Sequence, residues 1–217
     1  MFQNQEIAKD IFYVGVNDRQ KHKFENMLPL PLGVSYNAYM IIDEKTALID
    51  TVDIAMGDLF IDKIQSQLKG RKLDYLIINH MEPDHSGSIK LIRKYYPEMI
   101  IVGNSKTLSM VEGFYGVDNN MLEIKDEEVL SLGKHKLQFH LTPMVHWPET
   151  MMTFDLGEKV LFSGDAFGCF GTLDGAIVDS DMNIDRYWNE MTRYYANIVG
   201  KYGIQVTNAL KKASTLD

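Results

Sequence analysis

The sequence is poor in cysteine and lacks long apolar runs. Its 217 residues include one cysteine, Cys169, so no disulfide can form within the chain, as is typical of proteins kept in a reducing compartment. A membrane-spanning helix needs about 18 or more consecutive apolar residues, and no run approaches that length. The first residues also lack the basic and apolar segments of a secretion signal. We therefore expect a soluble cytoplasmic protein with no membrane partner.

Positive charge is also scarce. The chain has 22 lysines and arginines against 30 aspartates and glutamates, a formal net charge of −8, which is poorly suited to the phosphate backbone of nucleic acid. The hydrophobic share of 45% and the charged share of 24% are typical of a globular domain. No repeat, low-complexity segment or Pro/Gly/Ser-rich linker divides the chain. We predict one domain over residues 1–217.

Strands and helices alternate along the first half of the chain, and hairpins follow. Apolar runs and period-two patterns predict strands at residues 11–16, 35–42, 46–52, 73–79, 99–102, 129–132, 136–141, 150–156 and 159–163. Apolar residues at three- and four-residue spacing predict helices at 58–68, from 86–88 to Pro97, at 105–115, and from Asp185 to Leu210 with breaks at Gly200 and Gly203. Serine hydroxyls at 86, 88 and 105 and the Asp185 carboxylate are the expected caps. This order of elements predicts a mixed α/β fold with covered sheets.

The most specific stretch is His80-Met81-Glu82-Pro83-Asp84-His85, which places four metal-ligating side chains within six residues of a loop after the 73–79 strand. In an extended backbone alternate residues share a side, so His80, Glu82 and Asp84 are expected to face one site while His85 approaches differently. That arrangement suits two ions better than one. Two imidazoles and two carboxylates without a thiolate favour iron, manganese or zinc. A solvated polar loop is the alternative, but it does not require this alternation.

Two further candidate ligands, His146 and Asp165, each follow an expected strand. Loops at strand ends can converge on one site while the sheets stay rigid. Together with the four residues of the loop they make six candidates, enough for a pair of ions with Asp165 as the bridge.

These segments resemble the metallo-β-lactamase-like domain of flavodiiron proteins (A-type flavoproteins). The matching segments are 29–39, Leu48-Ile49-Asp50-Thr51, 80–88, His146-Trp147-Pro148-Glu149-Thr150 and Ser163-Gly164-Asp165-Ala166-Phe167-Gly168. The resemblance extends over essentially the whole chain. It implies an αβ/βα four-layer sandwich.

The resemblance also implies roles for individual residues. Zinc hydrolases of the same superfamily usually carry histidine where this chain has Glu82, and an anionic oxygen ligand favours iron through its ferric state. By this comparison one iron would be held by His80, Glu82 and His146, and the other by Asp84 and a later histidine, with Asp165 bridging and His85 a ligand in some members only. Tyr195 matches a family tyrosine near the irons that would donate a proton or a hydrogen bond, although a core-facing tyrosine is an equal alternative. Trp147 and Phe167 flank candidate ligands and would exclude water there, although ordinary core aromatics are the alternative.

The family's last histidine ligand lies in a Leu-His-Gly segment that this sequence lacks, as it lacks the flavodoxin-like domain that binds FMN. We therefore expect a metal domain truncated at its C-terminal end. The resemblance implies two Fe ions, reduction of dioxygen to water or of nitric oxide to nitrous oxide, rubredoxin or a flavin reductase as electron donor, and a homodimer. The alternatives are a zinc-dependent hydrolase of thioesters or lactones, and a fragment without turnover.

Overall fold

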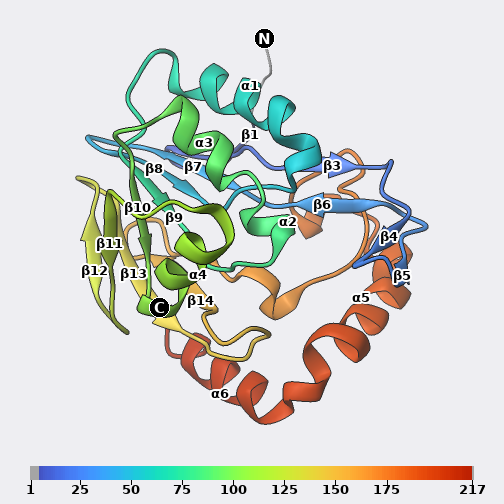
Figure 1. The fold of residues 1–217 in the computed structure, drawn as a ribbon. Coiled ribbons are helices and arrows are strands. Elements are labelled where there is room, and N and C mark those ends of the chain that lie inside the picture. Colours follow the sequence, from blue (N-terminus) through green and yellow to red (C-terminus); the bar gives the residue numbers. More distant parts are fainter. Residues whose placement is uncertain (1–4, 217) are drawn as a thin grey trace.

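The computed structural model describes residues 5–216 and builds them around two facing β-sheets (Figure 1). The larger sheet has seven strands in the order β1-β2-β7-β8-β9-β10-β11 and the smaller has four in the order β12-β13-β14-β15. Their bounds are Gln5–Ala8, Ile11–Tyr13, Tyr39–Ile42, Thr46–Ile49, Tyr75–Ile77, Ile100–Gly103 and Met121–Glu123, then Val129–Ser131, Lys136–Leu141, Met151–Asp155 and Val160–Phe162. Two small ribbons pair β3 (Val16–Asp18) with β6 (Val34–Tyr36) and β4 (Lys23–Phe24) with β5 (Leu28–Pro29).

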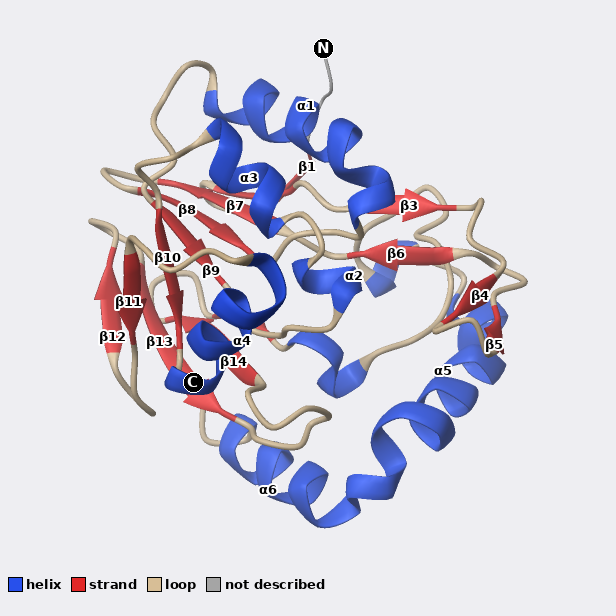
Figure 2. Ribbon diagram, in the orientation of Figure 1, coloured by secondary structure: helices blue, strands red, loops and turns tan. Residues whose placement is uncertain are grey.

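The longer helices form the outer layers of the molecule, whereas the single turn of α2 lies inside it (Figure 2). They are α1 Gly57–Leu68, α2 Pro83–Ser86, α3 Ile89–Tyr95, α4 Ser105–Tyr115, α5 Trp188–Tyr194 and α6 Gly203–Ala213, with short 3-10 turns at Ile54–Met56, Gly164–Phe167, Asp179–Asp181, Ile184–Tyr187 and Gly200–Tyr202 and a π turn at Tyr195–Val199. Helices α1, α3 and α4 cover the outer face of the large sheet, and α6 packs on the small one. The expected four-layer sandwich is therefore confirmed.

Alternation along the central strands separates two layers of core. In β8, Leu48 packs toward α1 and α3, whereas its neighbours Ala47 and Ile49 pack toward the small sheet. Successive side chains of a strand point to opposite faces, so both faces of these strands must be apolar. The inner layer is completed by the small sheet, which contributes Leu137, Phe139, Met151 and Phe162. Near-continuous apolar strands in the sequence are thus explained by burial on both sides.

Several expected elements are shorter than the sequence predicts. The strand expected at 11–16 is interrupted at Gly15, where a Cβ would lie 2.3 Å from the carbonyl oxygen of Tyr36, and the strand expected at 35–42 is divided into β6 and β7. The long helix from Asp185 breaks at the turns from Tyr195 to Tyr202, which include the expected break at Gly200. Strand β11 was not foreseen, because it is only three residues long, too short for a clear alternating pattern.

The expected helix caps were mostly wrong. Asn104, and not Ser105, caps α4 by accepting hydrogen bonds from the backbone N–H groups of Lys106 and Thr107 at 3.1 and 3.2 Å. Ser88 precedes α3 without a side-chain cap. Asp185 lies inside the turn that it was expected to cap. Of residues 5–216, no helix is both long and apolar enough to cross a membrane.

Phe139→Ala tests the packing between the sheets. Phe139 is fully buried in that layer, and truncating a buried phenylalanine costs about 3–5 kcal/mol. We expect a loss of that size in the free energy of unfolding, measured by urea titration. Phe114→Ala, at a side chain that is 57% exposed on α4, is the matched control and should change stability by no more than about 0.5 kcal/mol. Equal losses would contradict this account of the core.

Candidate metal centre

The candidate centre lies at the edge of the large sheet where three parallel strands end. Strands β8, β9 and β10 are paired in parallel, so their carboxyl ends meet at one edge. Asp50 directly follows β8, His80 comes three residues after β9, and Asn104 directly follows β10. All three side chains are buried. Polar groups that are far apart in the sequence are thus collected by the sheet alone.

The metal-ligating loop is extended only as far as Glu82. Pro83 begins α2, a position where its missing N–H costs no hydrogen bond, and the carbonyl of Glu82 accepts from the N–H groups of His85 and Ser86 at 2.9 and 3.0 Å. Asp84 and His85 therefore project from a helical turn. The expected alternation was wrong for Asp84, because proline at the first helical position favours a helix over a continued strand.

Four ligating atoms from four separate residues meet at one point. His146 Nε2 lies 2.9 Å from Glu82 Oε2 and 3.3 Å from both His80 Nε2 and Asp165 Oδ2, and His80 Nε2 lies 3.4 Å from each of the two carboxylate oxygens. All four residues are buried, and these atoms lie within 4.8 Å of one another. Ligands about 2.1 Å from a tetrahedral ion are about 3.4 Å apart. The cluster therefore has the size of a metal site.

Asp165 connects this cluster to the remaining candidates. It sits on the 3-10 turn after β15, and its second oxygen, Oδ1, lies 2.9 Å from His85 Nε2. Asp84 Oδ2 is 3.4 Å from the same nitrogen. The two oxygens of Asp165 thus face different groups of ligating atoms, one on each side.

Unpaired buried oxygens support a cation at this position. Glu82 Oε1 and Asp84 Oδ1 are buried without a hydrogen-bond donor among the described residues. Leaving a charged oxygen buried and unpaired costs several kcal/mol, and metal ions are the usual partners of such groups. The residues present therefore fit a bound metal, and the mixed set of nitrogen and oxygen donors suits iron, manganese or zinc.

The metal-free cluster has strongly shifted pKa values. Burial opposes the charge on His80, but its hydrogen bonds to Glu149 and Glu82 raise its pKa to about 10. Burial opposes the charge of the Glu82 carboxylate and acts to raise its pKa, but hydrogen bonds from His146 and His80 lower that pKa to about 2. Burial raises the pKa of Asp84 to about 7. In each case the shift reflects several like and unlike charges held in one small volume.

Comparison with known proteins agrees with this geometry. Residues 34–215 match the model of the ODP family of β-lactamases. The chain belongs to this family. It is 36% identical over 199 residues to the rubredoxin-oxygen oxidoreductase of Megalodesulfovibrio gigas, covering 91% of this chain and 49% of that one. It is 33% identical over 209 residues to the anaerobic nitric oxide reductase flavorubredoxin of Aliivibrio fischeri, with coverages of 95% and 42%.

Solved structures give the same result. The flavodiiron protein of Giardia intestinalis superimposes with a TM-score of 0.94 at 28% identity, over 100% of this chain and 53% of that one. The chain thus spans about half the length of the relatives it matches. The resemblance of this ODP family chain to the metal domain of flavodiiron proteins is confirmed.

Two other expected residues are largely exposed to solvent. Tyr195 is 51% exposed and Phe167 is 57% exposed. The adjacent Tyr194 is instead buried beside Asp165, and burial together with the charge of Asp165 raises its pKa well above the usual range. Gly168 permits this packing, because a Cβ there would lie 2.4 Å from the Tyr194 ring. Adjacent side chains of a helix point about 100° apart. The sequence pattern did not show which of the two tyrosines faces the site.

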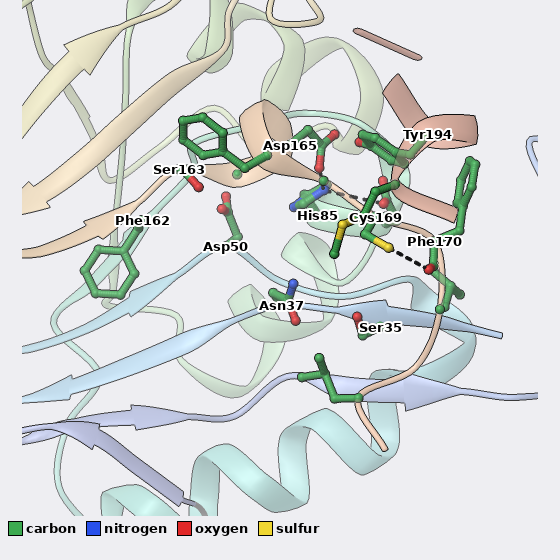
Figure 3. Close-up of a pocket in the computed structure, with 18 of the residues that line it drawn as sticks. Ser35, Asn37, Asp50, His85, Phe162, Ser163, Asp165, Cys169, Phe170 and Tyr194 are labelled. Carbon is green, nitrogen blue, oxygen red and sulfur yellow. Dashed lines mark hydrogen bonds and ion pairs between the residues drawn. The ribbon is translucent and has the colours of Figure 1, made fainter. Parts of the chain in front are cut away.

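A cavity of about 310 Å³ opens beside Asp84, His85 and Asp165 (Figure 3). Its other walls include Asp50 and Cys169, in addition to aromatic side chains. The Cys169 thiol donates to the carbonyl of Phe170 at 3.0 Å, and burial raises its pKa to about 11. The ODP family chain therefore has enclosed space on the His85 side of Asp165.

Two buried acids, Glu149 and Asp50, were missed as site residues. Both lie in segments that carried the family resemblance, but nothing in their spacing distinguishes them from other loop acids. Asp50 Oδ1 accepts a hydrogen bond from the N–H of Asn79 at 2.7 Å, immediately before His80. Tertiary contacts, which the spacing of the sequence does not reveal, place them at the centre.

Asp50→Asn tests the electrostatics of this edge. Burial raises the pKa of Asp50 to about 6 against an ordinary 3.8, so the folded chain binds a proton that the unfolded chain releases. The contribution of Asp50 to stability therefore falls as pH rises from about 4 to 6. In the metal-free protein, Asp50→Asn should gain on the order of 2 kcal/mol relative to the parent across this range, measured by urea unfolding at each pH. A constant difference would show that Asp50 is not destabilised by burial.

Proposed function

We propose that this chain is the iron-binding catalytic part of a flavodiiron oxygen or nitric oxide reductase. The observation that carries the proposal is the buried tetrahedron of His80, Glu82, His146 and Asp165, in which two of the four ligating groups are carboxylates. Relatives named as a rubredoxin-oxygen oxidoreductase and a nitric oxide reductase support the reaction class.

In this proposal each candidate ligand has one task. His80, Glu82 and His146 would hold one iron, Asp84 and His85 would face the second, and Asp165 would lie between the two. The support for the bridge is that its Oδ2 lies 3.3 Å from His146 whereas its Oδ1 lies 2.9 Å from His85. When bound, the irons supply electrons and open coordination positions for reducing dioxygen to water or nitric oxide to nitrous oxide, with FMN restoring the electrons.

The surrounding side chains keep this volume dry. The Trp147 ring packs edge-on against His80, with centroids 5.3 Å apart, and its centroid lies 6.2 Å from that of His146. Tyr194 closes the Asp165 side with its buried ring and is better placed than Tyr195 to donate a hydrogen bond there. We propose Tyr194 for the role first expected of Tyr195.

The electron donor, the assembly and the location are further parts of the proposal. The name of the Megalodesulfovibrio gigas relative supports rubredoxin as donor, and a flavin reductase is the alternative. We propose a homodimer; in proteins of the family that carry the flavin domain, this domain of one subunit would serve the metal centre of the other. The single cysteine supports a reducing, cytoplasmic location. We assign residues 1–217 to one domain.

A zinc hydrolase is the second candidate, because a tetrahedron of this size also suits zinc. The donor set favours iron: one nitrogen in the usual zinc arrangement is replaced by the carboxylate of Glu82, and Glu82, Asp84 and Asp165 together bring three anionic groups. The negative charge of three carboxylates is closer to the positive charge of two iron ions than to that of a single zinc ion. A chain that binds no metal would be the third possibility.

Metal analysis tests the function directly. Anaerobically purified protein should contain two irons per chain, measured by mass spectrometry of the metals together with the intact mass of the chain. Asp165→Asn removes the charge of the bridge, and we expect iron occupancy to fall to one or fewer. Asp118→Asn, at an exposed site, is the matched control. Zinc in place of iron would favour the hydrolase, and two irons retained in Asp165→Asn would refute the bridge.

Glu82→His tests the choice of metal. The substitution restores the imidazole usual in zinc enzymes, so we expect occupancy to shift from iron toward zinc when both ions are offered at equal concentration. The reason is the loss of an anionic ligand that stabilises ferric iron. Glu123→His, on an exposed position of β11, controls for the added histidine. Unchanged iron selectivity would refute the role of Glu82.

A further inference from the structure

Glu149 makes a contact with the cluster that the proposed metal ligation does not use. Its Oε1 lies 2.8 Å from His80 Nδ1, the ring nitrogen that faces away from the four ligating atoms. The same oxygen accepts a hydrogen bond from the N–H of Met81 at 2.8 Å. Glu149 is 1% exposed and His80 is fully buried, so water does not compete for this contact.

The position of Glu149 is itself fixed by its surroundings. Its backbone carbonyl accepts a hydrogen bond from the Asn104 side chain at 2.6 Å, and the oxygen of that side chain caps α4. Trp147 and Thr150, which lie on either side of Glu149 in the sequence, are hydrogen-bonded to each other. The N–H of Trp147 donates to Thr150 Oγ1 at 3.2 Å, and that hydroxyl donates to the Trp147 carbonyl. The carboxylate therefore sits on a rigid turn and not on a free loop.

A carboxylate in this place determines which nitrogen of His80 carries the proton. A carboxylate only accepts hydrogen bonds, so the shared proton resides on His80 Nδ1. In neutral His80 the other nitrogen, Nε2, then presents its lone pair to the cluster. The negative charge also makes the imidazole a stronger electron donor, as carboxylate partners of metal-bound histidines do.

We propose that Glu149 is a positioning residue that holds His80 in the tautomer and orientation needed to ligate iron through Nε2, and that it raises the affinity of the site for the metal. This inference rests on the proposed metal function. It adds a residue that acts through His80 without touching the ion. The turn from His146 to Thr150 would then supply one ligand directly and orient a second.

Glu149→Gln tests the inference because it keeps the shape and one acceptor oxygen but removes the charge. We expect ferrous iron to bind roughly 10- to 100-fold more weakly, measured anaerobically by competition with a chromophoric chelator, and zinc to be weakened in parallel. The midpoint potential of the bound iron should rise, since a weaker donor stabilises ferric iron less. Glu112→Gln, an exposed position on α4, is the matched control and should match the parent in both measurements.

A measurement on the parent protein requires no substitution. In the zinc-loaded chain, nitrogen and proton NMR of labelled histidine should show His80 bound to zinc at Nε2 and protonated at Nδ1, with the Nδ1 proton shifted downfield by its hydrogen bond to the Glu149 carboxylate. The opposite tautomer overturns the inference even if Glu149→Gln does not fold.

The outcomes separate this inference from the proposed function. If the parent binds two irons but Glu149→Gln leaves both affinity and potential unchanged, the function stands and the positioning role is refuted. If the parent binds zinc and excludes iron, the reductase is refuted while a zinc affinity that depends on Glu149 still supports the positioning role. If the parent binds neither ion, both are refuted.

Discussion

Parallel pairing of β8, β9 and β10 is the constraint on which the rest of this structure depends. It places the ends of three strands at one edge, so that the polar residues that follow each strand meet there. Both faces of these strands are buried, so a slip of the register would expose apolar side chains. The same apolar packing that stabilises the fold therefore also sets the spacing of the ligating atoms.

Much of this arrangement could be predicted from the sequence. The His80 loop, with His146 and Asp165 at later strand ends, identified the cluster, and the apolar runs identified the central strands. The path of the loop could not be predicted as well, because Pro83 is compatible with an extended turn as well as with a helix start. Tyr194 and Tyr195 differ only in the side of the helix they occupy, and a break in that helix removed the periodicity that would have separated them.

The positions of buried polar residues could not be predicted from the sequence either. Glu149 and Asp50 owe their positions to backbone donors at Met81 and Asn79, and such partners have no signature in the sequence. Asn104 shows the same point, since it caps one helix and also holds the carbonyl of a residue 45 positions away. The role of a residue that contacts two separate segments cannot be predicted from the pattern of either segment by itself.

Cys169 has a consequence for the durability of the protein. Its thiol borders the cavity beside Asp165, and burial keeps its pKa near 11, so almost none of it is thiolate at neutral pH. Oxidants attack the thiolate and not the thiol. A cysteine next to a centre proposed to handle dioxygen or nitric oxide is thereby less reactive toward oxidants than an ordinary exposed thiol, which slows its oxidation to sulfenic acid.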